Sequence, residues 1–462
     1  MTAKLALGRK VGYGVGDFGF GLFFLTASQF LLYYYTDVLG LDPATAGWVF
    51  GGAVVWDAIW DPVMGALANR TRTRWGRYRP YLLFAGVPLA LSWVLIFLPN
   101  NFSGTALIIY ALLAHLLFRS CYACASMPYL ALSAAMTEDS TERSSLAGFR
   151  LVFQAFAGVL VAFATLPLAE ALGGGQPGFF KVALMYGVVA AALLIIVFAV
   201  TREITVGEDL KVRPSFGAMI RMLRSNRAFW LVCGAFLIGS IANVFFNKSL
   251  PYFMKYGLDE PKLIGPALGI LAMTITFSIP LWTLVSKRTS KRTTFLIGTA
   301  IALVAYIGLW FAPTEAPAWL SLIAVLGFGS GAVFLSTWAM MPDTVEYGEW
   351  KSGVRAEGAV FGFVSLVQKA SLGLAAGLLG EVLSAIGYTA NATQTPETLE
   401  SLRVVMLGVP ALFTAVAAIS VLFYPLDART HGRLVSILQR RRARTTAAAL
   451  EEGAASQSRG PR

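Results

Sequence analysis

Two aspartates, Asp57 and Asp61, lie four residues apart in the otherwise apolar segment Trp56–Gly65. On a helix this spacing places both carboxylates on one face. A carboxylate in the middle of a membrane helix costs roughly 2.5–3.5 kcal/mol on insertion scales, so a pair of them needs a compensating partner. The usual partner is an ion or a substrate, and an intramembrane Arg or Lys is the alternative. We therefore predict a cation site at this pair.

The elements that must position these carboxylates are membrane helices. The chain has 462 residues, 56% of them hydrophobic and 13% charged, whereas soluble domains carry about 25% charged residues. About twelve apolar stretches reach the ~20 residues that span a bilayer. They cover residues 11–36, 43–69, 80–99, 104–135, 145–172, 179–201, 228–252, 263–286, 294–313, 317–341, 358–386 and 402–425. We predict an all-α, multi-pass membrane protein whose first helix is retained, because no cleavage site follows the basic start.

Lysines and arginines are distributed unevenly along the chain. They concentrate at the N-terminus, in the loops after alternate predicted spans, including Arg70–Pro80, and in the tail. The opposite side carries only four, which are Lys181, Lys255, Lys262 and Arg403. By the positive-inside rule, both termini are cytoplasmic. The net charge of +12 therefore reflects topology in a cell inner (plasma) membrane, and we expect no nucleic-acid partner.

The chain divides near its middle into two similar halves. Residues 1–201 and 228–425 are predicted to form two six-helix bundles, joined by a cytoplasmic loop at 202–227. Residues 426–462 form a basic tail, for which we expect a short helix followed by disorder. Weak internal symmetry of this kind is typical of transporters, which bind substrate between the halves near the bilayer midplane.

Several motifs of the chain resemble one family of transporters. They are Tyr-Gly-x-Gly-Asp at 13–17, Tyr-Tyr-Thr-Asp-Val-Leu-Gly at 34–40, the segments 56–65 and 70–80, Glu142-Arg143, and Asp-Thr-Val-Glu-Tyr-Gly-Glu at 343–349. From about residue 11 to 425, the chain resembles the glycoside-pentoside-hexuronide:cation symporters. This branch of the major facilitator superfamily includes the melibiose permeases. The resemblance implies the major facilitator fold, alternating access, a monomer, and uptake of a glycoside coupled to Na⁺, Li⁺ or H⁺.

The resemblance assigns the coupling cation to Asp57 and Asp61, but the other ligand positions differ. The family has an Asn just before the second Asp, where this chain has Trp60, and a Thr on the fourth helix, where it has Ala123. Hard cations require several oxygen ligands. Two carboxylates can bind one proton with less help, so we predict proton coupling over Na⁺ coupling.

The sugar-binding positions implied by the resemblance are retained unevenly. The acidic residues of galactoside-binding members are replaced by Gly21 and Ser126, a Lys by Phe20, and a Trp by Leu130. The family's Tyr, Arg and Lys are retained as Tyr122, Arg150 and Lys369. Its sugar-stacking Trp is replaced by another aromatic residue, Phe334. Our candidate substrate-binding residues are Arg119, Tyr122, Ser126, Arg150, Lys248, Phe334, Trp338 and Lys369.

Basic residues exceed acidic ones in the predicted midplane. Arg119, Arg150, Lys248 and Lys369 lie within predicted spans, and buried cations need anionic partners. The surplus suggests an anionic substrate such as a hexuronide, because Arg suits bidentate carboxylate binding. Structural roles are the alternatives to substrate binding. Lys248 would extend to the water interface, and Arg119 would pair with Asp57 or Asp61. His115, on the same predicted helix as Arg119, would be a packing residue.

Matched charges on the predicted cytoplasmic side suggest a latch between the halves. The candidate gating residues are Arg70, Arg74, Arg77, Arg143, Asp343, Glu346 and Arg355. We expect them in loops, with one loop at 343–357. Their alternative role is to determine topology, and both roles are compatible.

Other functions stay open at this point. One is transport of a lysophospholipid-like or other non-sugar organic anion, and another is export by the same fold. We do not expect an enzyme, because the acids in the short external loops (Asp37, Asp42, Glu315, Glu397 and Glu400) are scattered. We expect no cofactor or metal beyond the coupling ion, and we interpret Cys121 and Cys124 as packing residues. The expected partners are a small-molecule substrate and membrane lipid.

Overall fold

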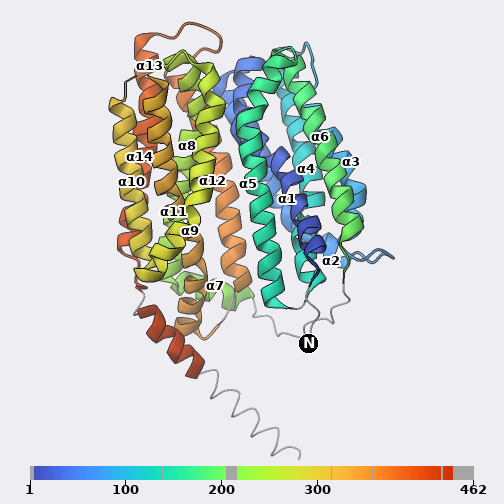
Figure 1. Cartoon of the computed structure of the whole chain (residues 1–462), viewed down its shortest axis with the longest axis vertical. Coiled ribbons are helices and arrows are strands. Elements are labelled where there is room, and N and C mark those ends of the chain that lie inside the picture. The colour runs from blue at the N-terminus through green and yellow to red at the C-terminus, as the bar shows by residue number, and fades with distance from the viewer. Residues whose placement is uncertain are drawn as a thin grey trace, which may run out of the picture.

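The computed structural model describes residues 5–137, 139–203, 216–313, 315–354, 357–427 and 430–440. Long, nearly parallel helices make up these parts of the chain (Figure 1). In the N-terminal half they are α1 (Leu7–Tyr33), α2 (Pro43–Arg70), α3 (Arg79–Ile96), α4 (Gly104–Met136), α5 (Ser140–Ala171) and α6 (Gly175–Val200). In the C-terminal half they are α8 (Arg227–Tyr252), α9 (Ile264–Arg288), α10 (Lys291–Phe311), α11 (Ala316–Ser352), α12 (Glu357–Ala385) and α14 (Val409–Leu422), and a short helix, α13 (Pro396–Arg403), precedes α14.

Short helical segments extend several of these helices. The π-helical segments η1 (Tyr34–Val38), η2 (Phe253–Gly257) and η4 (Val404–Gly408) continue α1, α8 and α13, and a 3-10 turn, η3 (Pro261–Leu263), precedes α9. The helix α7 (Phe216–Ser225) lies within the predicted central loop. Residues 204–215 of that loop, and the tail from residue 441, lie outside the described residues.

Eleven of the described helical segments are long and apolar enough to cross a membrane. They match the predicted spans except the second, because α2 is not among the eleven although it has 28 residues. Asp57 and Asp61 lie in its second half and lower its hydropathy. Since α2 packs against α4 and α12 inside the bundle, the chain is an integral, multi-pass membrane protein with an all-α fold.

The predicted loop at 343–357 is wrong for most of its length. Helix α11 continues through this segment to Ser352 and ends at Gly353, which has a left-handed backbone. Its apolar run stops near Met341, but the following turns still have a buried face, where Gly348 packs against Met222 of α7. The helix therefore ends where its packing ends, beyond the end of its hydrophobic run.

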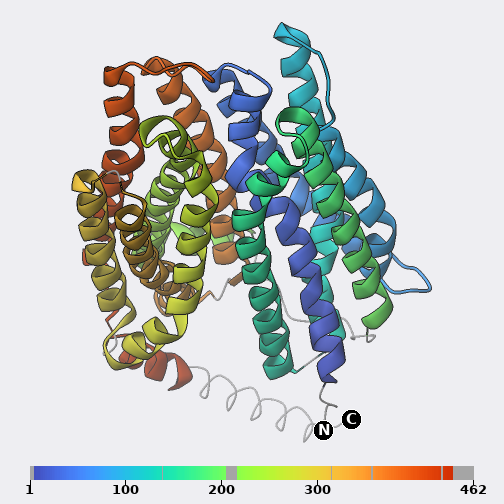
Figure 2. The ribbon, with the colours of Figure 1, turned by 45° about the horizontal axis from the view of Figure 1, so that its top comes forward.

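The two halves stand side by side and contact each other along three pairs of helices (Figures 1 and 2). The pairs are α2 with α12, α5 with α9, and α1 with α8. The start of α1 and the helix 430–440 lie at the same end of the molecule (Figure 1). We refer to that end as the cytoplasmic end and to the opposite one as the outer end, following the charge distribution.

Candidate functional site

The predicted cation pair lies where α2 meets α12. Lys369 of α12 places its Nζ 2.9 Å from Asp57 Oδ2 and also donates a hydrogen bond to Asp61 Oδ2. Arg119 of α4 adds a second positive charge, with Nη1 3.7 Å from Asp57 Oδ2. Pairing of both aspartates with intramembrane bases, the alternative left open by the sequence, is therefore present in this conformation.

Each aspartate keeps one oxygen outside this ion-pair network. Asp57 Oδ1 and Asp61 Oδ1 are buried and have no hydrogen-bond partner among the described residues. A buried acceptor without a donor is costly, so such an atom is a favourable place for a proton or a cation. The pair is thus compensated by Lys369 on one side, and one oxygen of each carboxylate stays without a donor from the described residues.

The two positions at which the family supplies further oxygen ligands offer none here. The ring of Trp60 stacks on Trp56, with centroids 5.6 Å apart and planes 14° apart. Ala123 is fully buried and has only a methyl group. Neither residue can replace the water shell of a metal cation, which keeps proton coupling as our prediction.

A second ion pair joins α1 to α5. Arg150 donates through Nε to Asp17 Oδ2 and through Nη2, at 3.3 Å, to Asp17 Oδ1. Tyr13 and Tyr129 support the pair, since each hydroxyl donates to the other residue's carbonyl oxygen at 2.9 and 2.8 Å. The Arg150 guanidinium lies over the Tyr129 ring. The sequence analysis named Arg150 as a candidate substrate-binding residue, and the structure pairs it with Asp17.

A cavity of about 580 Å³ lies between the halves and includes both ion pairs in its wall. Seven of the eight predicted substrate-binding residues line it: Arg119, Tyr122, Ser126, Arg150, Phe334, Trp338 and Lys369. The rings of Phe20, Phe24, Phe236 and Tyr306 also contribute to the wall. Aromatic faces combined with a few polar groups are typical of small-molecule sites, and this volume suits a ligand of that class.

Lys248, the eighth predicted residue, does not line the cavity. Its side chain is only 2% exposed, so the alternative that it extends to the water interface does not hold in this structure. Its Nζ donates to the carbonyl oxygen of Ser28 at 2.8 Å and lies 3.8 Å from the centre of the Phe50 ring. This lysine of the C-terminal half therefore contacts two helices of the N-terminal half.

The charges of the cavity wall are balanced. Its described acids are Asp17, Asp57 and Asp61, and its described bases are Arg119, Arg150 and Lys369. The predicted surplus of positive charge at the substrate site is therefore absent from this wall, because each base has a carboxylate partner. The electrostatic argument for an anionic substrate loses its basis in this conformation.

His115 lies on α4, one turn before Arg119. It is fully buried and accepts a hydrogen bond from Arg119 Nε at 3.3 Å, and its Nδ1 has no partner within the described part of the chain. The rings of Phe50 and Tyr35 pack against its edge. The packing role foreseen as an alternative for His115 agrees with these contacts.

The predicted gating residues of the N-terminal half form local contacts. Arg70 and Arg143 are exposed, and the Arg74 guanidinium lies 4.3 Å from the centre of the Trp75 ring. Arg77 donates its backbone N–H to Glu203 at 2.8 Å. Beside them, Lys10 donates to Glu142, which holds the pKa of that carboxyl below its usual value. These contacts stay within one half, and a latch through these arginines stays a prediction.

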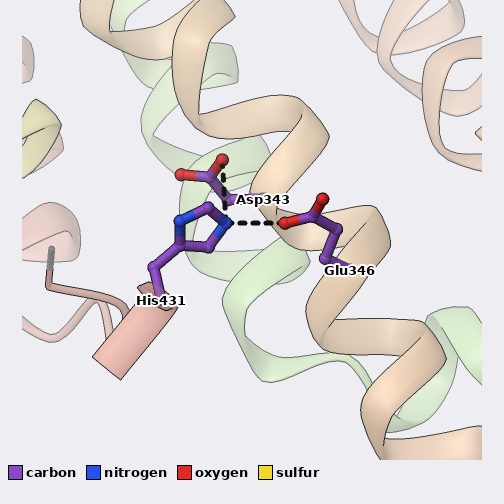
Figure 3. A group of neighbouring side chains, drawn as sticks. All are labelled: Asp343, Glu346 and His431. Atoms are coloured by element: carbon purple, nitrogen blue, oxygen red, sulfur yellow. Dashed lines mark hydrogen bonds and ion pairs between the residues drawn. The ribbon is translucent and has the colours of Figure 1, made fainter. Parts of the chain in front are cut away.

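The predicted gating acids of the C-terminal half form one cluster (Figure 3). His431, on the helix 430–440, lies 2.6 Å from Glu346 Oε2 and 3.4 Å from Asp343 Oδ1. Lys291 donates to both oxygens of Asp343, at 2.7 and 2.8 Å. A divalent metal ion would have to displace this ammonium group, so we interpret the cluster as an ion-pair network that holds the C-terminal helix against α11. Arg355, the last predicted gating residue, lies outside the described residues.

Comparison with known proteins assigns the chain to a family. Residues 12–428 match the family of MFS/sugar transport proteins. The chain is 30% identical to an isoprimeverose transporter of Lactiplantibacillus pentosus over 95% of this chain and 93% of the relative. It is also 30% identical to a glucuronide carrier protein homologue of Escherichia coli (strain K12), over 96% and 97%.

A solved structure confirms the fold. A bacterial homologue of the human lysosomal transporter Spinster, in an inward-facing and unoccupied conformation, superposes with a TM-score of 0.66 over 93% of this chain and 97% of the other, at 14% identity. At this level of identity the likeness shows the major facilitator fold alone. Together with the motifs and the family match, it leads to one conclusion: the chain belongs to the MFS/sugar transport proteins, within the glycoside-pentoside-hexuronide:cation symporter branch of the major facilitator superfamily.

Proposed function

We propose that this protein is a secondary active transporter that takes up a glycoside together with a cation, with H⁺ favoured over Na⁺. The observation that supports this proposal is the position of Lys369 against Asp57 and Asp61 in the wall of a cavity shared by both halves. A lysine in that place acts as an internal cation when the coupling ion is absent. Binding of the coupling ion would then compete with the ammonium group for the carboxylates.

This competition provides a way to link the ion to the substrate. Asp57 and Asp61 belong to the N-terminal half and Lys369 to the C-terminal half. A proton on the aspartate pair weakens the attraction that joins the halves at this point. It also frees the Lys369 ammonium group, which lines the cavity, to donate hydrogen bonds to a substrate hydroxyl.

The substrate class that we propose is a glycoside with an aromatic-stacked sugar ring. Phe334 and Trp338 lie one helical turn apart on α11 and both line the cavity, and apolar sugar faces pack well on such rings. The relatives' names include both a neutral and an acidic sugar, isoprimeverose and glucuronide. Until the coupling proton releases Lys369, an acidic glycoside would have to displace a carboxylate from one of the bases of the wall, whereas a neutral glycoside leaves these ion pairs intact.

Purified protein in liposomes loaded with a pH-sensitive dye tests this proposal. The substrates would be a panel of neutral glycosides, glucuronides and galacturonides, each with and without Na⁺. We expect substrate-dependent proton entry and uphill accumulation. Asp61→Asn should abolish accumulation yet keep substrate binding detectable, because it removes an ion ligand that lies apart from the aromatic wall.

Glu170→Gln is the matched control, since Glu170 is an exposed acid of α5 that does not line the cavity. It should transport normally. Normal uphill accumulation by Asp61→Asn would remove the aspartate from the coupling site. Glycoside uptake that requires Na⁺ and leaves the internal pH constant would show that the coupling ion is Na⁺. The absence of uptake and of a dye signal with every sugar would favour a non-sugar substrate.

A further inference from the structure

A row of polar contacts between α1 and α8 covers the outer side of the cavity. On α8 the cavity wall reaches Val244. Beyond it, Lys248 and Tyr252 of α8 and then Lys255 of η2 follow toward the outer end. From the cavity outward, the contacts are Lys248 Nζ with the Ser28 carbonyl oxygen (2.8 Å), Tyr252 with the Thr36 hydroxyl (3.0 Å), and Lys255 Nζ with Asp37 Oδ1 (2.7 Å). Each contact joins one half of the protein to the other.

Asp37 forms the outermost and most extensive of these contacts. Besides Lys255, Tyr256 donates to its Oδ1 at 2.6 Å and Tyr388 donates to its Oδ2 at 2.8 Å. Asn391 donates its side-chain N–H to the Asp37 carbonyl oxygen at 2.7 Å. All four donors come from the C-terminal half. In Figure 2 the blue end of α1 and the orange segment after α12 accordingly lie side by side at the outer end.

The stability of the Asp37 carboxylate depends on closure of the outer end. Its side chain is 1% exposed, and an ionised carboxylate at this depth needs its hydrogen bonds. When the halves part, Thr36, which donates to Asp37 Oδ2 at 2.8 Å, is the one donor of this group that stays on the same half. Water can replace the others once the site is open, so a polar contact of this kind can form and break repeatedly.

Of the four bases predicted at the midplane, Lys248 is the one for which the described residues supply no carboxylate partner. Its described contacts are a carbonyl oxygen and an aromatic ring, with no carboxylate. It therefore lies between the cavity and Asp37 as an inner contact of the same closed end. The base that the sequence analysis assigned to an anionic substrate is better explained by closure of the outer end.

We propose that Asp37 is the latch of the outer gate: its hydrogen bonds to Lys255, Tyr256 and Tyr388 hold the cavity closed on the outer side, and their loss opens it. This inference rests on the proposed transport function, because a gate is useful only to a protein that alternates access. It assigns a role to the Tyr-Tyr-Thr-Asp-Val-Leu-Gly motif at residues 34–40, which contributes nothing to the cation pair.

Access of a thiol reagent to the cavity tests the latch without any substrate. Asn243 is exposed in the cavity wall, one turn inside Lys248. An Asn243→Cys variant, made in a full-length chain whose Cys121, Cys124 and Cys233 are changed to Ala, would be treated in intact cells with a membrane-impermeant maleimide. Asp37→Asn should raise the labelling rate at least about tenfold, since hydrogen bonds to a charged group are among the stronger ones.

Asp42→Asn is the matched control. Asp42 is an exposed carboxylate of the same outer loop that caps α2 through Thr45, and Asn caps a helix equally well. The Asn243→Cys protein that carries Asp42→Asn should be labelled at the same rate as the Asn243→Cys protein in which Asp37 and Asp42 are both intact. Tyr388→Phe removes one donor, and Lys255→Gln removes the positive charge that pairs with Asp37, so each should give an intermediate rate. Lys262→Gln, at an exposed lysine of the same end, should give no increase.

The outcomes separate the latch from the transport proposal. Equal labelling of Asp37→Asn and Asp42→Asn, both recovered as monodisperse protein, would overturn the latch. If Asp37→Asn fails to fold, the other two variants decide: unchanged labelling rates in both Tyr388→Phe and Lys255→Gln would also overturn the latch. Faster labelling in a protein that transports no glycoside would support the latch and refute the sugar assignment alone.

Discussion

At the scale of single residues, the energetics of the site depend on which base pairs with each buried acid. Lys369 contacts both Asp57 and Asp61, and Arg150 contacts Asp17. Removing one partner of a buried ion pair leaves an uncompensated charge, which costs more than removing the whole pair. The aspartate pair and its lysine should therefore behave as one energetic unit.

Lys369→Met tests this unit through thermal stability. It leaves two carboxylates facing each other without their ammonium partner, so we expect a fall in the unfolding temperature in detergent. Adding Asp61→Asn should recover part of the loss, with a coupling energy on the order of 0.5–3 kcal/mol in the double-mutant cycle. Lys351→Met, at an exposed lysine near the end of α11, is the control and should leave the unfolding temperature unchanged. Strictly additive effects would show that Lys369 and Asp61 act independently.

At the scale of helices, the distance between these groups is set by a seam of glycines along α2 and α12. A Cβ added at Gly51 would lie 2.5 Å from the carbonyl oxygen of Gly373, and one added at Gly47 would lie 2.7 Å from that of Ala376. Small residues allow helix backbones to approach closely in a membrane. The seam begins one to two turns from Asp57, so it fixes the spacing of the aspartate pair and Lys369.

Gly51→Ala should therefore impair both stability and transport. The added methyl group would push α2 away from α12, and overpacking of this kind costs about 1–3 kcal/mol. Gly52→Ala is the neighbouring control: nothing lies within 4 Å of its Cβ, and Ala favours a helix over Gly by about 0.5–1 kcal/mol. Thermal unfolding and initial uptake rates measure the two effects. Equal behaviour of the two variants would exclude the seam as the element that sets this spacing.

The positions of the helices were more predictable from the sequence than the contacts between their side chains. Hydropathy alone predicted the long helices, but it missed α7, whose segment is too polar to resemble a span, and it ended α11 at its last apolar turn. Residue types identified Asp57, Asp61, Arg150 and Lys369 as site candidates. Which acid each base contacts depends on how distant helices are rotated against each other, with the partners 133 residues apart for Arg150 and 312 for Lys369 with Asp57, and the sequence does not contain that information. For the same reason Asp37 looked like a scattered external acid.

At the scale of the whole molecule, the two halves contact each other both at the central cavity and at the outer end. Lys369 joins them at the cation pair and Asp37 joins them at the outer end. Each contact is polar, and in the mechanism that we propose each is exchanged, the first for a cation and the second for water. A molecule held together in this way can change state by replacing partners, while its helices move as rigid bodies.

Reciprocal coupling is the whole-molecule consequence that can be measured directly. If the coupling cation displaces Lys369 and the released lysine contacts the glycoside, then the cation raises glycoside affinity, and the glycoside raises cation affinity by the same factor. We expect a factor of about 5–150, the usual range for such coupling. Calorimetric titration of glycoside at a series of proton and Na⁺ concentrations would give this factor, and titration of the cation at saturating glycoside would give its counterpart. Asp61→Asn should bind glycoside with an affinity that no longer depends on the cation. A dependence that survives in that variant would place the coupling ion elsewhere in the protein.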